Sequence, residues 1–229
     1  MIKHEEKTTA SSLHHDIRDR LRDDIVAGAK ASGVRLTIDA LAERYGSSHM
    51  PVREALKELA GEGLVLIEAH RGARARPIDL AFVENIFDIR IALESMLARR
   101  AAERISAAEL AQLEVTQTAL EDAAQRADGA AVLAANRQLH EIVNTAAANE
   151  DALTLVHRHR RLLAALWQRF GYGKERFPGV IADHRNLMAA LDARDSGAAA
   201  NIAAAHVARA KFELLSRMRA AGDAKANGR

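Results

Sequence analysis

The sequence predicts a mostly α-helical protein with two domains: a winged helix-turn-helix with a small β wing over residues 1–78, and an antiparallel bundle of six helices over residues 79–229. Two short amphipathic segments joined by a tight turn lie between residues 37 and 61. A β-rich hairpin with a glycine turn follows them. Beyond Pro77 strand patterns disappear, and alanine and leucine dominate. These three observations indicate a small N-terminal domain followed by an all-helical one.

The first helix of the N-terminal domain begins after Thr37, whose hydroxyl can cap it. Its apolar positions, among them Ile38 and Leu41, recur at helical spacing as far as Tyr45. Gly46 then supplies the left-handed residue that ends a helix at little cost. This pattern predicts a short helix and a tight turn.

The second helix has Ser48 as its expected N-cap, and Pro51 falls in its first turn, where no intrahelical N–H is lost. Gly61 and Gly63 end it. The helical spacing predicts one buried face and one exposed face. We expect it to bury Val52, Leu56 and Leu59 and to expose His49, Met50, Arg53 and Lys57.

A short hairpin follows, with a β-rich run over residues 64–68 and a turn at Gly72. Four basic residues gather there: His70, Arg71, Arg74 and Arg76. A helix-turn-helix followed by a basic wing is typical of proteins that place one helix in a groove of DNA. The alternative is that these arginines form only a solvated rim.

Pro77–Asp79 is the predicted domain boundary, because proline resists both a continued strand and an immediate helix. The helices expected after it cover residues 80–103, 107–126, 128–148, 150–170, 178–194 and 196–220. Their candidate caps are Asp79, Ser106, Asp128 and Ser196.

Composition narrows the class of protein. The chain has 229 residues, no cysteine and a net charge of +2. Disulfides and thiolate metal sites are therefore excluded. No secretory signal and no membrane-length apolar run is visible, in agreement with a mean hydropathy of −0.18. We expect a cytoplasmic protein that does not bind membranes.

Two stretches of the N-terminal domain, PVREAL at residues 51–56 and EGLV at 62–65, closely resemble the GntR superfamily of bacterial transcription regulators. The all-helical remainder resembles the FCD effector domain of its FadR subfamily, in the shorter VanR-like branch. The markers there are RIALE at residues 90–94, Leu139-His140, and the Asn-x-x-Leu pattern that begins at Asn149.

The resemblance implies a homodimeric transcription regulator, most often a repressor, on a pseudo-palindromic operator in double-stranded DNA. Its DNA-contacting residues fall here on Arg44, Ser48, His49, Met50, Arg53, Arg71 and Gly72. His49 and Met50 depart from the arginine and threonine usual in the family, so the operator sequence is not predicted.

Asn136 and His140 lie four residues apart and share one face of a predicted helix, while His184 and His206 lie on the last two helices. Spacing alone leaves open whether these histidines share a site, since the chain has ten. The resemblance implies that the four residues bind a divalent transition metal, zinc or nickel. Asn136 stands where many relatives have aspartate.

The same resemblance places Arg90 where it can bind the carboxylate of a small organic acid that controls DNA binding. An intrahelical salt bridge with Glu94 is the equal alternative. A metal-dependent hydrolase is disfavoured, because the single His-Asp dipeptide, His15-Asp16, lies in the N-terminal arm and no hydrolase motif is present. A DNA-binding protein with a purely structural metal stays open. We expect a regulator and not an enzyme.

Overall fold

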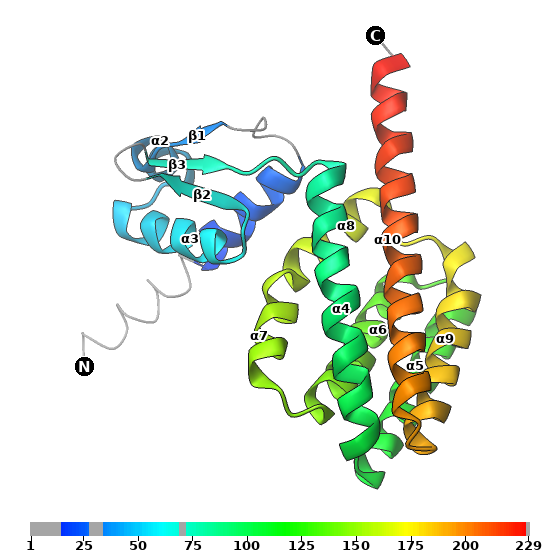
Figure 1. The fold of residues 1–229 in the computed structure, drawn as a ribbon. Helices are drawn as coiled ribbons and strands as arrows, with labels where there is room; N and C mark the ends of the chain where they lie inside the picture. The colour runs from blue at the N-terminus through cyan, green and yellow to red at the C-terminus, as the bar shows by residue number, and fades with distance from the viewer. Residues whose placement is uncertain (1–14, 28–33, 69–71, 228–229) are drawn as a thin grey trace. The chain divides into compact units, whose positions relative to one another are not determined.

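The computed structural model describes residues 15–27, 34–68 and 72–227, in which helices dominate and one small sheet is present (Figure 1). The chain forms two compact units. The first comprises the described residues up to Phe82 together with Arg158–Arg169, and the second comprises Val83–His157 and the described residues from Phe170 onward. None of the described helices is long and apolar enough to cross a membrane. The predicted fold class is confirmed.

The first unit holds the winged helix-turn-helix. A helix covers residues 15–26, and the sheet is antiparallel with the strand order β1-β3-β2. The elements that follow are β1 (Arg35–Leu36), α2 (Ile38–Tyr45), α3 (His49–Gly61), β2 (Val65–Glu68) and β3 (Gly72–Ala75). The strand β1 pairs with β3 and was not expected from the sequence.

Local sequence explains where the two helices of the motif begin and end. The Thr37 hydroxyl accepts a hydrogen bond from the Ala40 amide at 3.4 Å and caps α2. Gly46 ends that helix with φ 58°, the left-handed conformation that glycine adopts without strain. Ser48 occupies the N-cap position of α3, but its side chain makes no capping hydrogen bond.

The core of this domain is aliphatic. Leu41, Val52, Leu59 and Leu64 are buried, as their spacing predicts, and the helix over residues 15–26 adds Ile17 and Leu21 to the buried set. α3 thus has one buried face, while Arg53 and Lys57 lie on its exposed face.

Two buried arginines join the N-terminal helix to the end of α3. Arg22 donates to both carboxylate oxygens of Glu62, at 2.9 and 2.6 Å, and also to Asp19. Arg18 donates to Glu58 at 2.6 Å. Because the Arg22 side chain is only 5% exposed, these carboxylates are needed to stabilise its buried positive charge.

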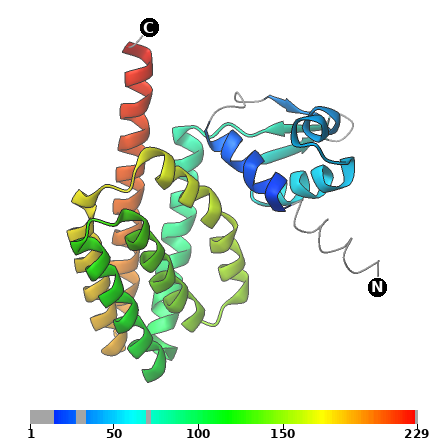
Figure 2. The same ribbon diagram turned by 180° about the vertical axis from the view of Figure 1, so that it is seen from behind.

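The helices of the second unit run up and down beside one another (Figure 2). They are α4 (Leu80–Arg104), α5 (Ala107–Gln125), α6 (Gly129–Ala146), α7 (Glu150–Arg158), α9 (Phe177–Asp192) and α10 (Ser196–Asn227), while α8 (Arg160–Phe170) belongs to the first unit. A short 3-10 turn, η1 (Lys174–Arg176), precedes α9. Their core is rich in alanine and leucine, and Leu97, Leu113, Leu139 and Leu191 are fully buried within it.

Two details differ from the sequence prediction. The helix expected over residues 150–170 is interrupted at His159 and forms α7 and α8, because its two halves pack in different units. The cap of α10 is Asp195 and not Ser196, since Asp195 Oδ1 accepts from the Ala198 amide at 2.9 Å. The second unit therefore has six helices among its described residues, and α8 belongs to the first unit. Caps at Asp79, Ser106 and Asp128 are as expected.

Replacing Glu62 with glutamine should destabilise the N-terminal domain. The buried Arg22 would keep only Asp19 as a charged partner, so the free energy of unfolding should fall by about 2–4 kcal/mol. Urea unfolding followed by the fluorescence of Trp167, the single tryptophan and a residue of the same unit, measures this change.

Glu54→Gln is the matched control, because Glu54 pairs with the exposed Lys57. It should change the free energy of unfolding by no more than about 0.5 kcal/mol. Equal losses in the two variants would contradict the role given to the buried pair.

Candidate metal centre and DNA-facing helix

Three histidines from three helices converge inside the bundle. His140 lies on α6, His184 on α9 and His206 on α10. Their ring centroids are 4.9–5.4 Å apart, and one ring nitrogen of each lies within 4.8 Å of those of the other two. Donor atoms on a tetrahedral zinc ion are separated by about 3.3 Å, so small side-chain adjustments suffice to bind one ion.

Asn136 adds an oxygen to this group. It lies one helical turn before His140 on α6, and its Oδ1 is buried. Neither Asn136 Oδ1 nor the buried Nε2 of His184 has a hydrogen-bond partner among the described residues. Buried polar atoms without partners are costly, and such atoms at a ring of imidazoles point to a ligand that would satisfy them.

Carboxylates lie beside the Nδ1 atoms of two histidines. Asp183 Oδ2 lies 3.0 Å from Nδ1 of His206, and Glu94 Oε2 lies 3.5 Å from Nδ1 of His140. An ionised carboxylate only accepts hydrogen bonds, so Nδ1 of His206 holds a hydrogen and its Nε2 presents a lone pair. The contact of His140 is longer, and Glu94 Oε2 has no hydrogen-bond partner among the described residues.

A chain of hydrogen bonds gives the same result for His184. Its Nδ1 lies 3.1 Å from Oε1 of Gln117. The Gln117 amide nitrogen donates to Glu121 at 2.9 Å, and Arg185 in turn donates to Glu121 at 2.7 and 2.9 Å. Because the amide nitrogen is directed to Glu121, its oxygen must face His184 and accept from Nδ1–H. Nε2 of His184 is then the unprotonated nitrogen.

Two ring nitrogens face each other at close range, since His140 Nε2 and His206 Nε2 are 3.1 Å apart. If His140 carries its proton on Nε2, this contact is a hydrogen bond, and if it carries the proton on Nδ1, two lone pairs face each other and a cation between the rings would bind both. The three imidazole nitrogens and the carboxamide oxygen therefore fit a divalent transition metal ion, which prefers imidazole donors.

Burial keeps two of these imidazoles, His140 and His184, uncharged. It holds the pKa of His140 well below its usual range, and the nearby charges of His206 and His184 act in the same direction. Burial, together with the charge of His206, lowers the pKa of His184 to about 3. Neutral imidazole is the form that binds a metal.

Arg90 contacts Glu94 in this structure. Its Nε and Nη2 both lie 2.6 Å from Oε1 of Glu94, and the side chains of the pair are 18% and 2% exposed. The charge of Arg90 also contributes to the low pKa of His140. The salt bridge and the position beside the histidines thus coexist, and contact between Arg90 and an external carboxylate stays a prediction.

Several of the residues that the sequence analysis predicts to contact DNA lie on the exposed face of α3. Met50 is 65% exposed, and His49 Nε2 lies 3.2 Å from Asp39. Arg53 is exposed and makes no ion pair with any residue that the structure describes. Lys57, in contrast, is bonded to Glu54 at 2.8 Å.

The other predicted DNA-contacting residues have different surroundings. Arg44 lies 2.7 Å from Asp24, so its charge is already paired. Gly72 opens β3 with φ 86°, as a turn glycine does. Arg71 lies outside the described residues.

Sequence reasoning missed the residues that orient the imidazoles: Gln117, Glu121 and Asp183. Gln117 and Glu121 have the ordinary spacing of a polar helix face, and nothing in it indicates a buried amide. Asp183 directly precedes His184 in the sequence, yet it contacts His206 instead. Only the packing of α9 against α10 brings that pair together.

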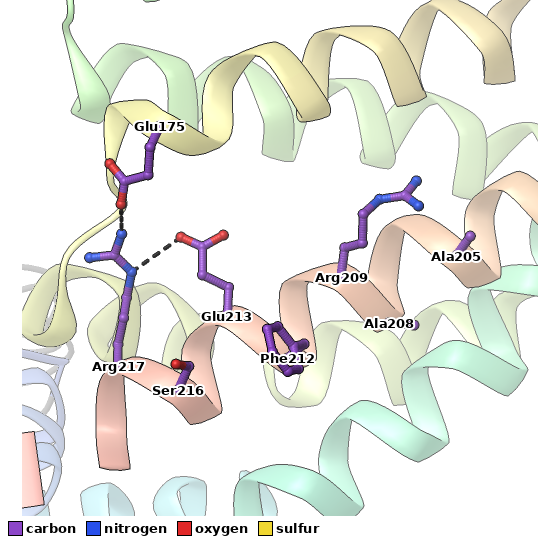
Figure 3. Close-up of a pocket in the computed structure, with 8 residues that line it drawn as sticks. All are labelled: Glu175, Ala205, Ala208, Arg209, Phe212, Glu213, Ser216 and Arg217. Carbon is purple, nitrogen blue, oxygen red and sulfur yellow. Dashed lines mark hydrogen bonds and ion pairs between the residues drawn. The ribbon is translucent and has the colours of Figure 1, made fainter. Parts of the chain in front are cut away.

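An open groove of about 760 Å³ lies on the outer face of α10 (Figure 3). Arg217 spans one end of it, bonded to Glu175 and Glu213, and Phe212 is exposed along it. Arg209 also lines the groove and binds Asp183. Because Asp183 in turn contacts His206, the Arg209–Asp183 ion pair connects the groove to the histidine ring.

Comparison with known proteins agrees with this architecture. Residues 13–74 match the model of bacterial regulatory proteins of the gntR family, and residues 85–209 match the FCD domain. The HTH-type transcriptional repressor RspR of Escherichia coli is 42% identical over 94 residues, which are 41% of each chain. The chain thus spans about two fifths of the length of that relative.

Two further relatives match over most of the chain. The HTH-type transcriptional regulator McbR of Escherichia coli is 26% identical over 80% of this chain and 84% of its own. A probable D-xylose utilization operon transcriptional repressor of Paenarthrobacter nicotinovorans is 26% identical over 88% of each. These relatives are named as regulators of transcription and not as enzymes.

Solved structures support the fold alone. That of McbR/YncC from E. coli has a TM-score of 0.65 at 23% identity, covering 90% of this chain and 98% of the other. Because the FCD match covers more than half of the chain and the gntR match covers the helix-turn-helix before it, this protein belongs to the gntR family of bacterial regulatory proteins and carries an FCD domain.

Proposed function

We propose that this protein is a DNA-binding transcription regulator whose affinity for its operator is controlled by a small carboxylate ligand at a metal centre in the FCD domain. The observation that carries the proposal is the ring of three imidazoles and one carboxamide in a chain that also has a winged helix-turn-helix. A purely architectural DNA-binding protein would not need such a ring, because burying polar groups costs free energy.

DNA binding is supported by the exposed Arg53, which pairs with none of the residues that the structure describes, on a helix whose other face is buried. Recognition helices of this kind enter the major groove, and two of them from a homodimer meet half-sites about 34 Å apart. We therefore infer a homodimer on a pseudo-palindromic operator. A protein acting on such DNA would work in the cytoplasm.

The metal centre would be held by Asn136, His140, His184 and His206. When bound, a divalent ion such as zinc or nickel supplies a positive point that attracts carboxylate oxygens. Arg90, beside His140, can turn from Glu94 to a ligand carboxylate and hold it in a bidentate contact.

Arg90 lies on α4, the helix that begins directly after the linker at residues 76–79. A ligand that favours one arrangement of α4 would shift the population of the helix-turn-helix arrangements, and only by as much as its affinities for the two differ. We propose repression that the ligand relieves. The second candidate is a metal that only fastens the three helices together, in which case no ligand alters DNA binding.

Arg53→Ala should abolish specific operator binding. Loss of a base-reading arginine typically costs about 1–3 kcal/mol of discrimination. Titration of an operator selected from random DNA measures the change, with Arg126→Ala as control, because Arg126 is an exposed arginine at the end of α5. Wild-type operator affinity in a folded Arg53→Ala protein would rule out this assignment.

The protein purified without chelator should carry about one divalent ion per protomer. The double variant His140→Ala/His184→Ala should carry none by elemental analysis, because two of three imidazole donors are lost. His157→Ala is the control, since His157 contacts Glu141 outside the ring. Unchanged metal content in the double variant would contradict the site.

Stability of the metal-free protein should depend on pH through His184. Its pKa is 6.5 when unfolded but about 3 when folded, so the unfolded chain takes up a proton first as the pH falls. This contribution is complete above pH 6.5 and is lost as the pH falls toward 3. Between pH 6.5 and 5 the free energy of unfolding should drop by about 2 kcal/mol from this residue.

Urea unfolding in a chelating buffer, followed by circular dichroism, measures that slope. His184→Gln should flatten it, whatever the variant's absolute stability. An equal slope in both proteins would show that His184 does not carry the effect.

A cognate carboxylate, found by a thermal-shift screen of organic acids, should weaken operator binding by about 5- to 150-fold in the wild type. It should leave His206→Ala and Arg90→Ala unaffected, although both should still bind DNA. Ligands that stabilise the protein yet leave operator affinity unchanged would favour the structural metal over the sensor.

A further inference from the structure

We infer further that the ligand of this centre carries two negative charges, an inference that rests on the proposed function. The chain offers a metal ion neutral donors only. The carboxylates that contact the histidine ring are already paired with arginines.

Four uncharged groups of the chain would donate to the metal ion. An imidazole nitrogen that binds a metal does so through an uncharged lone pair, and Nδ1 of His184 and of His206 is already hydrogen-bonded to Gln117 and to Asp183. The fourth donor, Asn136 Oδ1, is a carboxamide oxygen, likewise uncharged. A divalent ion held by these four groups would therefore keep its whole charge of two.

The surrounding carboxylates do not offset that charge. Glu94 is bonded to Arg90, and Asp183 is bonded through both oxygens to Arg209. Each carboxylate that contacts a histidine thus has its own arginine, and their charges cancel in pairs. Glu121, which reaches the ring only through Gln117, is bonded to Arg185.

A further arginine near the ring, Arg176, is also paired with a carboxylate. Arg176 Nη1 lies 3.1 Å from Glu213, and this pair also sums to zero. The charge of Arg176 nevertheless reaches the ring, since it contributes to the low pKa of both His140 and His184. The protein around the centre is thus neutral or slightly positive before any metal binds.

Uncompensated charge in a buried site is costly, so the centre should select the ligand that neutralises it. A singly charged anion would leave one positive charge, and a doubly charged anion would leave none. With aspartate at position 136 the requirement would fall to a single charge. Asn136 is therefore the residue that sets the charge of the ligand.

Oxalate and oxamate provide a matched pair of probes. They have nearly the same shape, and each can offer two oxygens to one ion, but oxalate has two charges and oxamate, in which an amide replaces one carboxylate, has one. Calorimetric titration of the zinc-loaded full-length protein should show at least about tenfold tighter binding of oxalate. Metal content after each titration checks that the probe has not removed the ion.

Asn136→Asp, which changes charge and not size, should reduce the preference for oxalate by at least about tenfold. Inorganic phosphate, a third probe, distinguishes the source of the two charges. Phosphate binding more tightly than oxalate would assign the ligand to the phosphate esters, and the reverse order to the dicarboxylates; either order supports the two-charge requirement.

Equal affinity of the wild type for oxalate and oxamate would overturn the inference even if Asn136→Asp failed to fold. The proposed function would then survive if either acid altered operator affinity. Failure of the zinc-loaded protein to bind any of the three anions would overturn both the inference and the sensor function.

Discussion

Three imidazoles lie together inside the FCD domain, and the hydrogen bonds that their ring nitrogens need determine which side chains surround them. Nδ1 of His184 and Nδ1 of His206 each meet an acceptor, and Nδ1 of His140 lies 3.5 Å from Glu94. Nε2 of His140 and Nε2 of His206 are 3.1 Å apart, a contact that either a proton on one of them or a cation between the rings satisfies. The acceptors come from three different helices, α4, α5 and α9, so the orientation of the ring depends on the packing of the whole bundle.

The sequence allowed the helix-turn-helix to be predicted almost residue by residue, because local signals determine it. Thr37 and Gly46 define the ends of α2, and helical spacing defines the buried face of α3. The break at His159 was missed, since no proline or glycine marks it and its cause is tertiary. Local patterns carry no information about which unit a helix face will join.

The residues of the candidate metal site and their partners were predictable to different degrees. Asn136 and His140 share a helix face by spacing alone, whereas His184 and His206 were assigned through family resemblance. Gln117 and Asp183 could not be found, because a buried amide and a buried carboxylate become recognisable only when α5 and α9 are placed against the ring. Long-range partners of this kind follow from packing and not from periodicity.

The groups that orient the buried rings are themselves held by ion pairs nearer the surface. Arg209 and Arg185, whose side chains are 55% and 38% exposed, bind the carboxylates of Asp183 and Glu121. An exposed pair contributes only about 0–1 kcal/mol by itself, while a misplaced buried polar group costs about 1–3 kcal/mol. Because these arginines act through buried partners, losing one should disturb the ring more than its own surface contact would suggest. The boundary of the metal centre therefore extends beyond its ligands to the outer faces of α9 and α10.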